Sequence, residues 1–111
     1  MPMIDVYAPA DIFPADADQE LGNELAKAVL RAEGVTNPVP FQSNNTAAFV
    51  HRLPVVSTAA QPSARSVRVQ IITPPGSLDR EGQKQITREA TEIVARIAGD
   101  PSLAASFECT N

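Results

Sequence analysis

The sequence has a single cysteine, a single histidine and no tryptophan among its 111 residues. Because Cys109 cannot form a disulfide within the chain, we expect a reducing, cytoplasmic location. The lone histidine has no second histidine or cysteine at ligand spacing, so we expect no metal site. A glycine-rich phosphate-binding loop is also missing, and no cofactor is expected.

Basic residues and long apolar runs are scarce as well. Lysine and arginine together number 9 against 13 acidic residues, and the net charge of -4 argues against a nucleic-acid partner. No apolar run approaches the ~20 residues that span a bilayer, and we expect no signal peptide and no membrane partner. At this length we expect one domain, residues 1–111, whose thin core favours oligomerisation.

Ten prolines divide the chain into short segments with recognisable periodicity. Residues 3–8 alternate between apolar and other side chains, which predicts a strand that Pro9 ends. Residues 15–33 predict a helix that Gly34 ends. Its apolar stripe consists of Leu21, Leu25, Ala28, Val29 and Ala32. A loop rich in proline and asparagine follows, and residues 46–53 predict a second strand.

The second half of the chain shows a similar order. Residues 54–66 predict a loop, with a short strand at 55–58 as an option, and residues 67–73 predict a strand. A second helix is expected over 78–98, with Ser77 as its N-cap. Its apolar stripe consists of Ile86, Ala90, Ile93, Val94 and Ile97. The tail SFECT is expected to form a short last strand.

The two halves align without a gap at an offset of 65 positions. This shift places Pro9 on Pro74 and Gly34 on Gly99, so strand end and helix end coincide. The chain is therefore predicted to be an α+β protein of two βαβ units, residues 2–56 and 66–111. Two folds suit this order: two units related by pseudo-twofold symmetry, with both helices on one face of a four-stranded sheet, or a ferredoxin-like sandwich.

Pro2 directly follows the initiator methionine and directly precedes the first strand. Methionine before a small residue such as proline is usually removed, which leaves a free secondary amine. An apolar environment disfavours the charged form of an amine, and a neutral amine is a base that can move a proton beside a carbonyl. The alternative is that Pro2 is only the first residue of a strand, where proline is tolerated.

Together with this pattern, the stretches MPMIDVYAPA, NNTAAFVHRLP, VRVQIITPPGSLDREGQ and AGDPSLA resemble the tautomerase superfamily. That superfamily includes 4-oxalocrotonate tautomerase, malonate semialdehyde decarboxylase and macrophage migration inhibitory factor. The resemblance implies the pseudo-twofold fold and a homotrimer. It also implies a cofactor-independent keto–enol tautomerase in which Pro2 acts as general base and acid on a small enol or 2-oxo acid.

Three further residues are candidates for substrate binding. Arg52 and Arg68 are suited to pairing with a carboxylate, although a solvent-facing arginine beside a sheet is the alternative for each. Asn45 lies where the decarboxylase relatives place an aspartate, and its amide can donate a hydrogen bond. Relatives with decarboxylase or dehalogenase activity carry arginines where this chain has Pro74 and Gly76. Hydratase-, dehalogenase- or decarboxylase-like chemistry and a non-catalytic ferredoxin-like oligomeric binding protein remain the alternatives.

Overall fold

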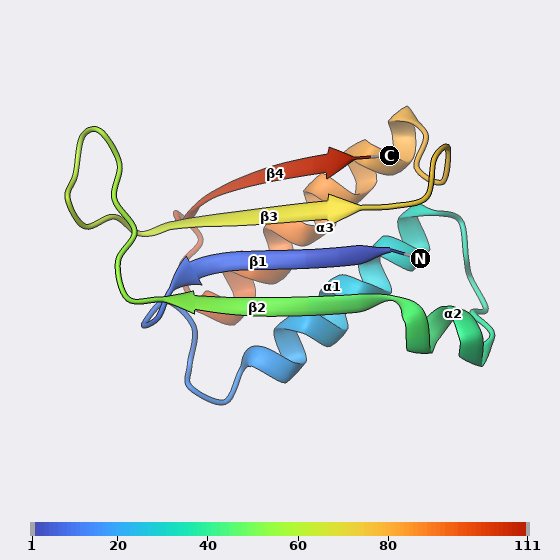
Figure 1. The fold of residues 1–111 in the computed structure, drawn as a ribbon, viewed down its shortest axis with the longest axis horizontal. Coiled ribbons are helices and arrows are strands. Elements are labelled where there is room, and N and C mark those ends of the chain that lie inside the picture. Colours follow the sequence, from blue (N-terminus) through green and yellow to red (C-terminus); the bar gives the residue numbers. More distant parts are fainter. Residues whose placement is uncertain (1, 111) are drawn as a thin grey trace.

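Two long helices pack against one face of a four-stranded mixed sheet in the computed structural model, which describes residues 2–110 (Figure 1). The elements, in chain order, are β1 (Met3–Pro9), α1 (Asp18–Ala32), α2 (Pro40–Asn45), β2 (Ala47–Leu53), β3 (Ser66–Ile72), α3 (Arg80–Ala98) and β4 (Ala104–Thr110). The long helices α1 and α3 lie behind the sheet in this view, and the short helix α2 lies beyond the start of β2.

The sheet has the strand order β2-β1-β3-β4. β1 pairs in parallel with β2, and β3 pairs in parallel with β4, so each βαβ unit keeps its two strands side by side. The units meet through the antiparallel pair of β1 and β3, in which Ile4 lies opposite Ile71. A ferredoxin-like split βαβ unit would place another strand between the parallel pair. The order therefore confirms the pseudo-twofold arrangement and excludes the ferredoxin-like one for the described residues.

The core lies between the sheet and the two long helices. Alternation along β1 buries Ile4, Val6 and Ala8 completely, while the same period along β3 buries Val67, Val69 and Ile71. Both predicted helical stripes point to this layer, and their central members are buried: Leu21, Leu25, Ala28, Val29, Ile86, Ala90, Ile93 and Val94. Ala32 and Ile97 close the ends of the stripes and are partly buried. Burial of this apolar surface is the main stabilising contribution to the fold.

Three local expectations are wrong. The proline- and asparagine-rich stretch contains the helix α2, which begins at Pro40 because proline suits the first helical position. Asp79, and not Ser77, is the N-cap of α3, and its carboxylate accepts a hydrogen bond from the Gly82 amide at 2.7 Å. The optional strand at 55–58 is a loop.

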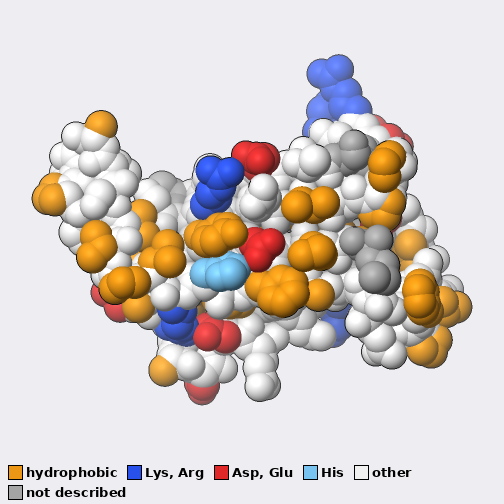
Figure 2. Space-filling model, viewed as in Figure 1, with side chains coloured by type: hydrophobic (Ala, Val, Ile, Leu, Met, Phe, Trp, Pro, Cys, Tyr) orange, Lys and Arg blue, Asp and Glu red, His pale blue; other side chains and the backbone are white. Residues whose placement is uncertain are grey.

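The face of the sheet opposite the helices is uncovered in the single chain. Met3, Phe49 and Ile72 are 40–46% exposed on it. Hydrophobic side chains are spread across this face around the single histidine (Figure 2). The His51 ring lies 2.8 Å from the Asp5 carboxylate and stacks on Tyr7. No helix among residues 2–110 is long and apolar enough to cross a membrane.

Candidate functional site

A cavity of about 300 Å³ lies at the end of the sheet where β1 and β2 begin. The end of α1, the helix α2 and the loop between β3 and α3 meet there, near the N-terminus (Figure 1). The residues that line it are Pro2, Leu30, Glu33, Val35, Phe41, Gln42, Asn45, Thr46, Pro74 and Ser77. The structure therefore brings two of the predicted site residues, Pro2 and Asn45, into one cavity.

Pro2 is buried, and its carbonyl oxygen accepts a hydrogen bond from the Ala47 amide at 3.3 Å. This bond continues the β1–β2 ladder by one residue, because Ala47 also lies opposite Met3. The sheet rather than a flexible side chain therefore holds the proline ring at the cavity. Leu30, Val35 and Phe41 give this cavity much of its apolar wall.

The polar side chains of α2 are largely occupied by the helix itself. The Asn45 amide donates to the Phe41 carbonyl at 2.7 Å, and the Thr46 hydroxyl donates to the Gln42 carbonyl at 2.8 Å. The Gln42 side-chain oxygen accepts from the Val39 amide at 3.0 Å. These bonds fix the short helix at the cavity. One N–H of Asn45 and the amide group of Gln42 are left as donors that these contacts do not use.

Glu33 is a cavity residue that the sequence analysis missed. It is the C-cap of α1 and half-buried. Burial raises the pKa of its carboxyl group, while the positive charge of the chain's N-terminus and a hydrogen bond from Ser77 act in the opposite direction. A helix C-terminus also disfavours negative charge. An acidic residue placed directly before Gly34, at a predicted helix end, was the signal available in the sequence.

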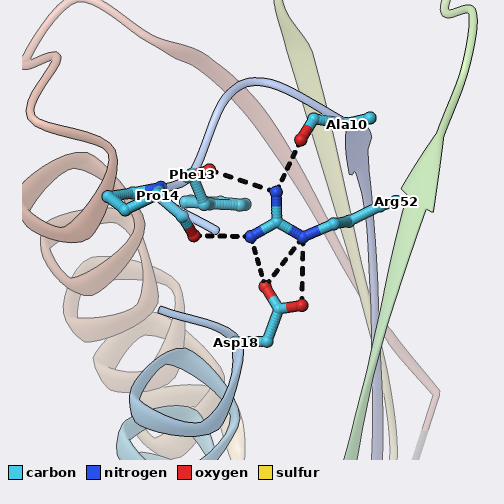
Figure 3. Close-up of polar contacts among 5 residues, drawn as sticks. All are labelled: Ala10, Phe13, Pro14, Asp18 and Arg52. Carbon is cyan, nitrogen blue, oxygen red and sulfur yellow. Dashed lines mark hydrogen bonds and ion pairs between the residues drawn. The ribbon is translucent and has the colours of Figure 1, made fainter. Parts of the chain in front are cut away.

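Arg52 lies at the other end of β2, about 20 Å along the strand from Asn45. Its guanidinium contacts both carboxylate oxygens of Asp18 at 2.7–3.0 Å (Figure 3). It also donates to the carbonyl oxygens of Ala10, Phe13 and Pro14. Arg52 thus ties the β1–α1 loop to β2, and the hydrogen bonds with Asp18 raise the pKa of the guanidinium. Arg52 does not line the cavity at Pro2, so its role in substrate binding stays a prediction.

Arg68 also lies away from the cavity. Its guanidinium is exposed on the open face of the sheet and lies 2.9 Å from the Glu108 carboxylate. The loop position Pro74 lines the cavity, whereas Gly76 does not and adopts a positive φ of 78°. No lysine, arginine or histidine is among the described residues that line the cavity.

One other hollow competes as a site. A groove of about 820 Å³ runs between α1 and the edge strand β2, but Pro2 does not line it. None of the predicted site residues Pro2, Asn45, Arg52 and Arg68 lines this groove. Residues 2–110 contain no cluster of three potential metal-ligating side chains. The cavity at Pro2 is therefore the candidate active site.

The chain is a small α+β protein whose double βαβ sheet carries a buried proline beside a cavity, at the end where β1 and β2 begin. No family model and no curated protein matches the chain. Solved structures do match. Native fused 4-OT (4-OT is 4-oxalocrotonate tautomerase) superimposes with a TM-score of 0.78 at 18% identity. The match covers 97% of this chain and 84% of the 4-OT chain. A fused 4-OT symmetric trimer gives 0.79 at 16% identity, covering 98% and 84%.

A macrophage migration inhibitory factor-like protein from Entamoeba histolytica is also similar. It superimposes with a TM-score of 0.73 at 16% identity, covering 99% of this chain and 88% of its own. Because 4-OT and macrophage migration inhibitory factor define the tautomerase superfamily, these likenesses confirm the resemblance at the level of the fold. The chain has the tautomerase fold.

Proposed function

We propose that the cavity is the active site of a cofactor-independent keto–enol tautomerase in which the nitrogen of Pro2 moves the proton. The observation that carries the proposal is the burial of Pro2 beside an otherwise largely apolar cavity. The tautomerase fold supports it, since the solved structures that share it include 4-OT proteins. Decarboxylase- or dehalogenase-like chemistry has less support, because Pro74 brings no arginine to the cavity.

The proposed reaction starts once Met1 has been removed and Pro2 carries a secondary amine. Burial disfavours the charged form of the amine, whereas the Glu33 carboxylate in the same cavity favours it. The proposed reaction uses the neutral amine as the base. It takes the proton from the enol hydroxyl, and the oxygen electrons form the carbonyl. The ammonium proton then passes to the carbon end of the former double bond. The amine is restored, and one proton has moved from oxygen to carbon.

In the proposed reaction, Asn45 assists this transfer. The N–H that is not bonded to the Phe41 carbonyl can donate to the substrate oxygen as negative charge develops there. The bond to Phe41 orients the amide before the substrate binds, so little reorganisation is needed in the transition state.

The test is the conversion of phenylenolpyruvate by methionine-free protein. The decrease in the absorbance of the enol measures the rate. Pro2→Ala keeps a free amine at the N-terminus but loses the ring, and we expect its rate to fall by about 100-fold or more, the contribution of a positioned base. Pro9→Ala is the matched control, since Pro9 is a buried proline at the far end of β1 and outside the cavity.

Protein that retains Met1 is a second comparison, because its Pro2 nitrogen is an amide and cannot accept a proton. Equal rates for the methionine-free protein, Pro2→Ala and the Met1 form would refute the proposal. Equal rates for wild type and Pro9→Ala, with a loss in the other two proteins, would support it.

We also propose that the chain assembles as a homotrimer. Its sheet exposes a row of large apolar side chains that includes Met3, Phe49 and Ile72. Exposed apolar surface of this kind marks an interaction site. Fused 4-OT, which shares the fold, is a trimer. The small-molecule substrate and the cytoplasmic location belong to the same proposal.

A further inference from the structure

Glu33 occupies a position where neither the helix nor the core requires a carboxyl group. The charged side chains at the ends of α1 follow the helix dipole, with Asp18 and Glu20 in the first turn and Arg31 in the last. Glu33 is the C-cap, where negative charge is disfavoured, and it is half-buried. The offset of 65 positions places Ala98 at the same point of the second unit. Because an alanine serves there, packing does not explain the carboxyl group of Glu33.

The Glu33 carboxylate has both a neutral donor and a positive charge acting on it. The hydroxyl of Ser77, in the loop between β3 and α3, donates a hydrogen bond to it. The positive charge of the chain's N-terminus lowers the pKa of the carboxyl group, although burial has the larger, opposite effect. Removal of Met1 moves this charge onto the nitrogen of Pro2, about one residue spacing along the chain. Pro2 lines the same cavity as Glu33, so the two groups can pair.

Charged groups on the elements around the cavity are engaged elsewhere. At the end of α1, Arg31 forms an ion pair with Glu89 at 2.9 Å. In the loop between β3 and α3, the Asp79 carboxylate accepts a hydrogen bond from α3. On β1, Asp5 lies 2.8 Å from the His51 ring on the open face of the sheet. α2 has no ionisable side chain, and none of these groups is among the described residues that line the cavity. The cavity's own carboxylate is therefore the partner available to the amine.

We propose that Glu33 is a positioning residue for Pro2: its carboxylate pairs with the ammonium that forms each time the ring nitrogen takes up a proton. The Ser77 hydroxyl holds the carboxylate in place before this charge develops, so the pair forms with little reorganisation. A fixed aspartate supports the histidine of a hydrolase triad in the same way. Glu33 itself neither takes nor gives the substrate proton. Its role in catalysis rests on the proposed tautomerase activity, whereas the ion pair does not.

The pairing has two effects on the amine. The carboxylate favours the charged form, so the amine keeps its proton to a higher pH. It also makes the neutral amine a stronger base and stabilises the positive charge that develops as the proton leaves the substrate. Removal of the carboxylate should therefore lower both the pH at which the amine titrates and the maximal rate.

The first test is a titration of the amine that needs no substrate. Methionine-free protein that contains isotope-labelled proline is titrated, and nuclear magnetic resonance follows the chemical shift of the Pro2 nitrogen. We expect the midpoint in Glu33→Gln to lie about one pH unit below that of wild type, the lower end of the effect of a nearby opposite charge. Glu33→Asp keeps the charge, so its midpoint should lie closer to wild type than to Glu33→Gln.

The second test is the pH dependence of kcat for phenylenolpyruvate. The value of kcat rises with pH as the amine becomes neutral, and this rise should begin about one pH unit lower in Glu33→Gln than in wild type. Once the amine is neutral in both proteins, we expect kcat of the variant to be about tenfold lower, because the developing ammonium has lost its partner. A purely structural role of Glu33 would change kcat by the same factor at every pH.

Glu24→Gln is the matched control, because it removes the same charge from α1 at a position outside the cavity. It should leave both the midpoint of the amine and the pH dependence of kcat unchanged. Circular dichroism of each variant shows that the fold is kept.

The outcomes separate this inference from the proposed function. An amine that titrates at the same pH in wild type and Glu33→Gln, or a shift of the same size in Glu24→Gln, would overturn the inference. Where Pro2→Ala loses activity, a kcat that Glu33→Gln leaves unchanged at every pH would overturn it as well. Equal rates for wild type and Pro2→Ala would overturn the proposed function alone, and the titration of the amine would then still decide whether the ion pair forms.

Discussion

Glu33 is held in a position that costs the folded protein stability when its carboxyl group is ionised. Burial raises its pKa above the ordinary value of 4.5. The folded state therefore holds the proton more tightly than the unfolded state, so the free energy of unfolding falls as pH rises across the interval between the two pKa values. Glu33→Gln removes this contribution.

We expect the difference in unfolding free energy between Glu33→Gln and wild type to grow in favour of the variant from about pH 4 upward and to level off once Glu33 is ionised in the folded state. Urea unfolding at a series of pH values measures it. The other carboxyl groups are common to both proteins and cancel in the difference. A difference that is constant with pH would contradict the placement of Glu33.

Gly82 in α3 lies close to the end of α1. A Cβ atom at Gly82 would lie 2.7 Å from the Ala32 carbonyl oxygen, so the backbones must move apart to accept it. Alanine is normally better than glycine inside a helix by about 1 kcal/mol. Here we expect Gly82→Ala to destabilise the protein by about 1–3 kcal/mol, the usual cost of overpacking.

Gly22→Ala is the control for this substitution. Its Cβ would meet Ala48 at 3.4 Å, an ordinary contact, so the helix preference should prevail and the variant should be as stable as wild type or slightly more stable. Thermal unfolding of both variants checks the sign. Equal stabilities for the two variants would show that the approach of α3 to Ala32 is looser than described.

Residues of the site differ in how far the sequence predicts them. Pro2 is predictable as a candidate because its proposed role depends on its position directly after Met1. Asn45 is a predicted site residue because of the resemblance to the tautomerase superfamily, and it does line the cavity. Glu33 and Ser77 meet only through the packing of α1 against α3, which joins residues 44 positions apart. No local sequence pattern predicts a contact between residues so far apart in the chain. The ion pair of Arg52 with Asp18 is unpredictable for the same reason.

At the scale of the elements, one side chain of the neighbouring strand β2 holds the loop between β1 and α1 in place. Arg52 contacts Asp18 and three carbonyl oxygens of the loop, and its side chain is only 23% exposed. Arg52→Gln leaves these acceptors without a charged donor. We expect the unfolding free energy to fall by about 2 kcal/mol, as for hydrogen bonds to a charged group.

This substitution also tests the predicted role of Arg52 in substrate binding. A structural role predicts that KM for the tautomerase substrate stays within about twofold of wild type, because the contact is about 20 Å from Asn45. Asp18→Asn is the matched variant and should lose stability in the same way. A large rise in KM for Arg52→Gln, but not for Asp18→Asn, would restore the predicted substrate contact.

Strands and long helices were predictable to within about three residues at their ends because their periodicity is strong. The repeat at an offset of 65 positions also gave the two βαβ units. What periodicity left open was the strand order, since the pseudo-twofold and ferredoxin-like arrangements bury the same alternating faces. The short helix α2 was missed because it buries no residue fully and so has no apolar stripe.

At the scale of the whole molecule, we propose that copies of the chain meet through the uncovered face of the sheet. Phe49 is 46% exposed near Met3 and Ile72, and these side chains lie on the face opposite the helices. In a trimer of the proposed kind this face is covered by neighbouring copies. A charge placed there would have to be desolvated in the assembly but not in the single chain.

We expect Phe49→Glu to shift the protein from a trimer to a monomer while the fold of each chain is kept. Light scattering after size exclusion measures the mass, and far-ultraviolet circular dichroism measures the fold. Thr87→Glu is the control. Thr87 is exposed on α3, on the helical side of the molecule, so the substitution adds the same charge away from the uncovered face of the sheet. It should leave the mass at three times that of one chain. A Phe49→Glu protein that remains trimeric would place the interface elsewhere, for example along the edge strand β2, where α1 and the sheet border the larger groove.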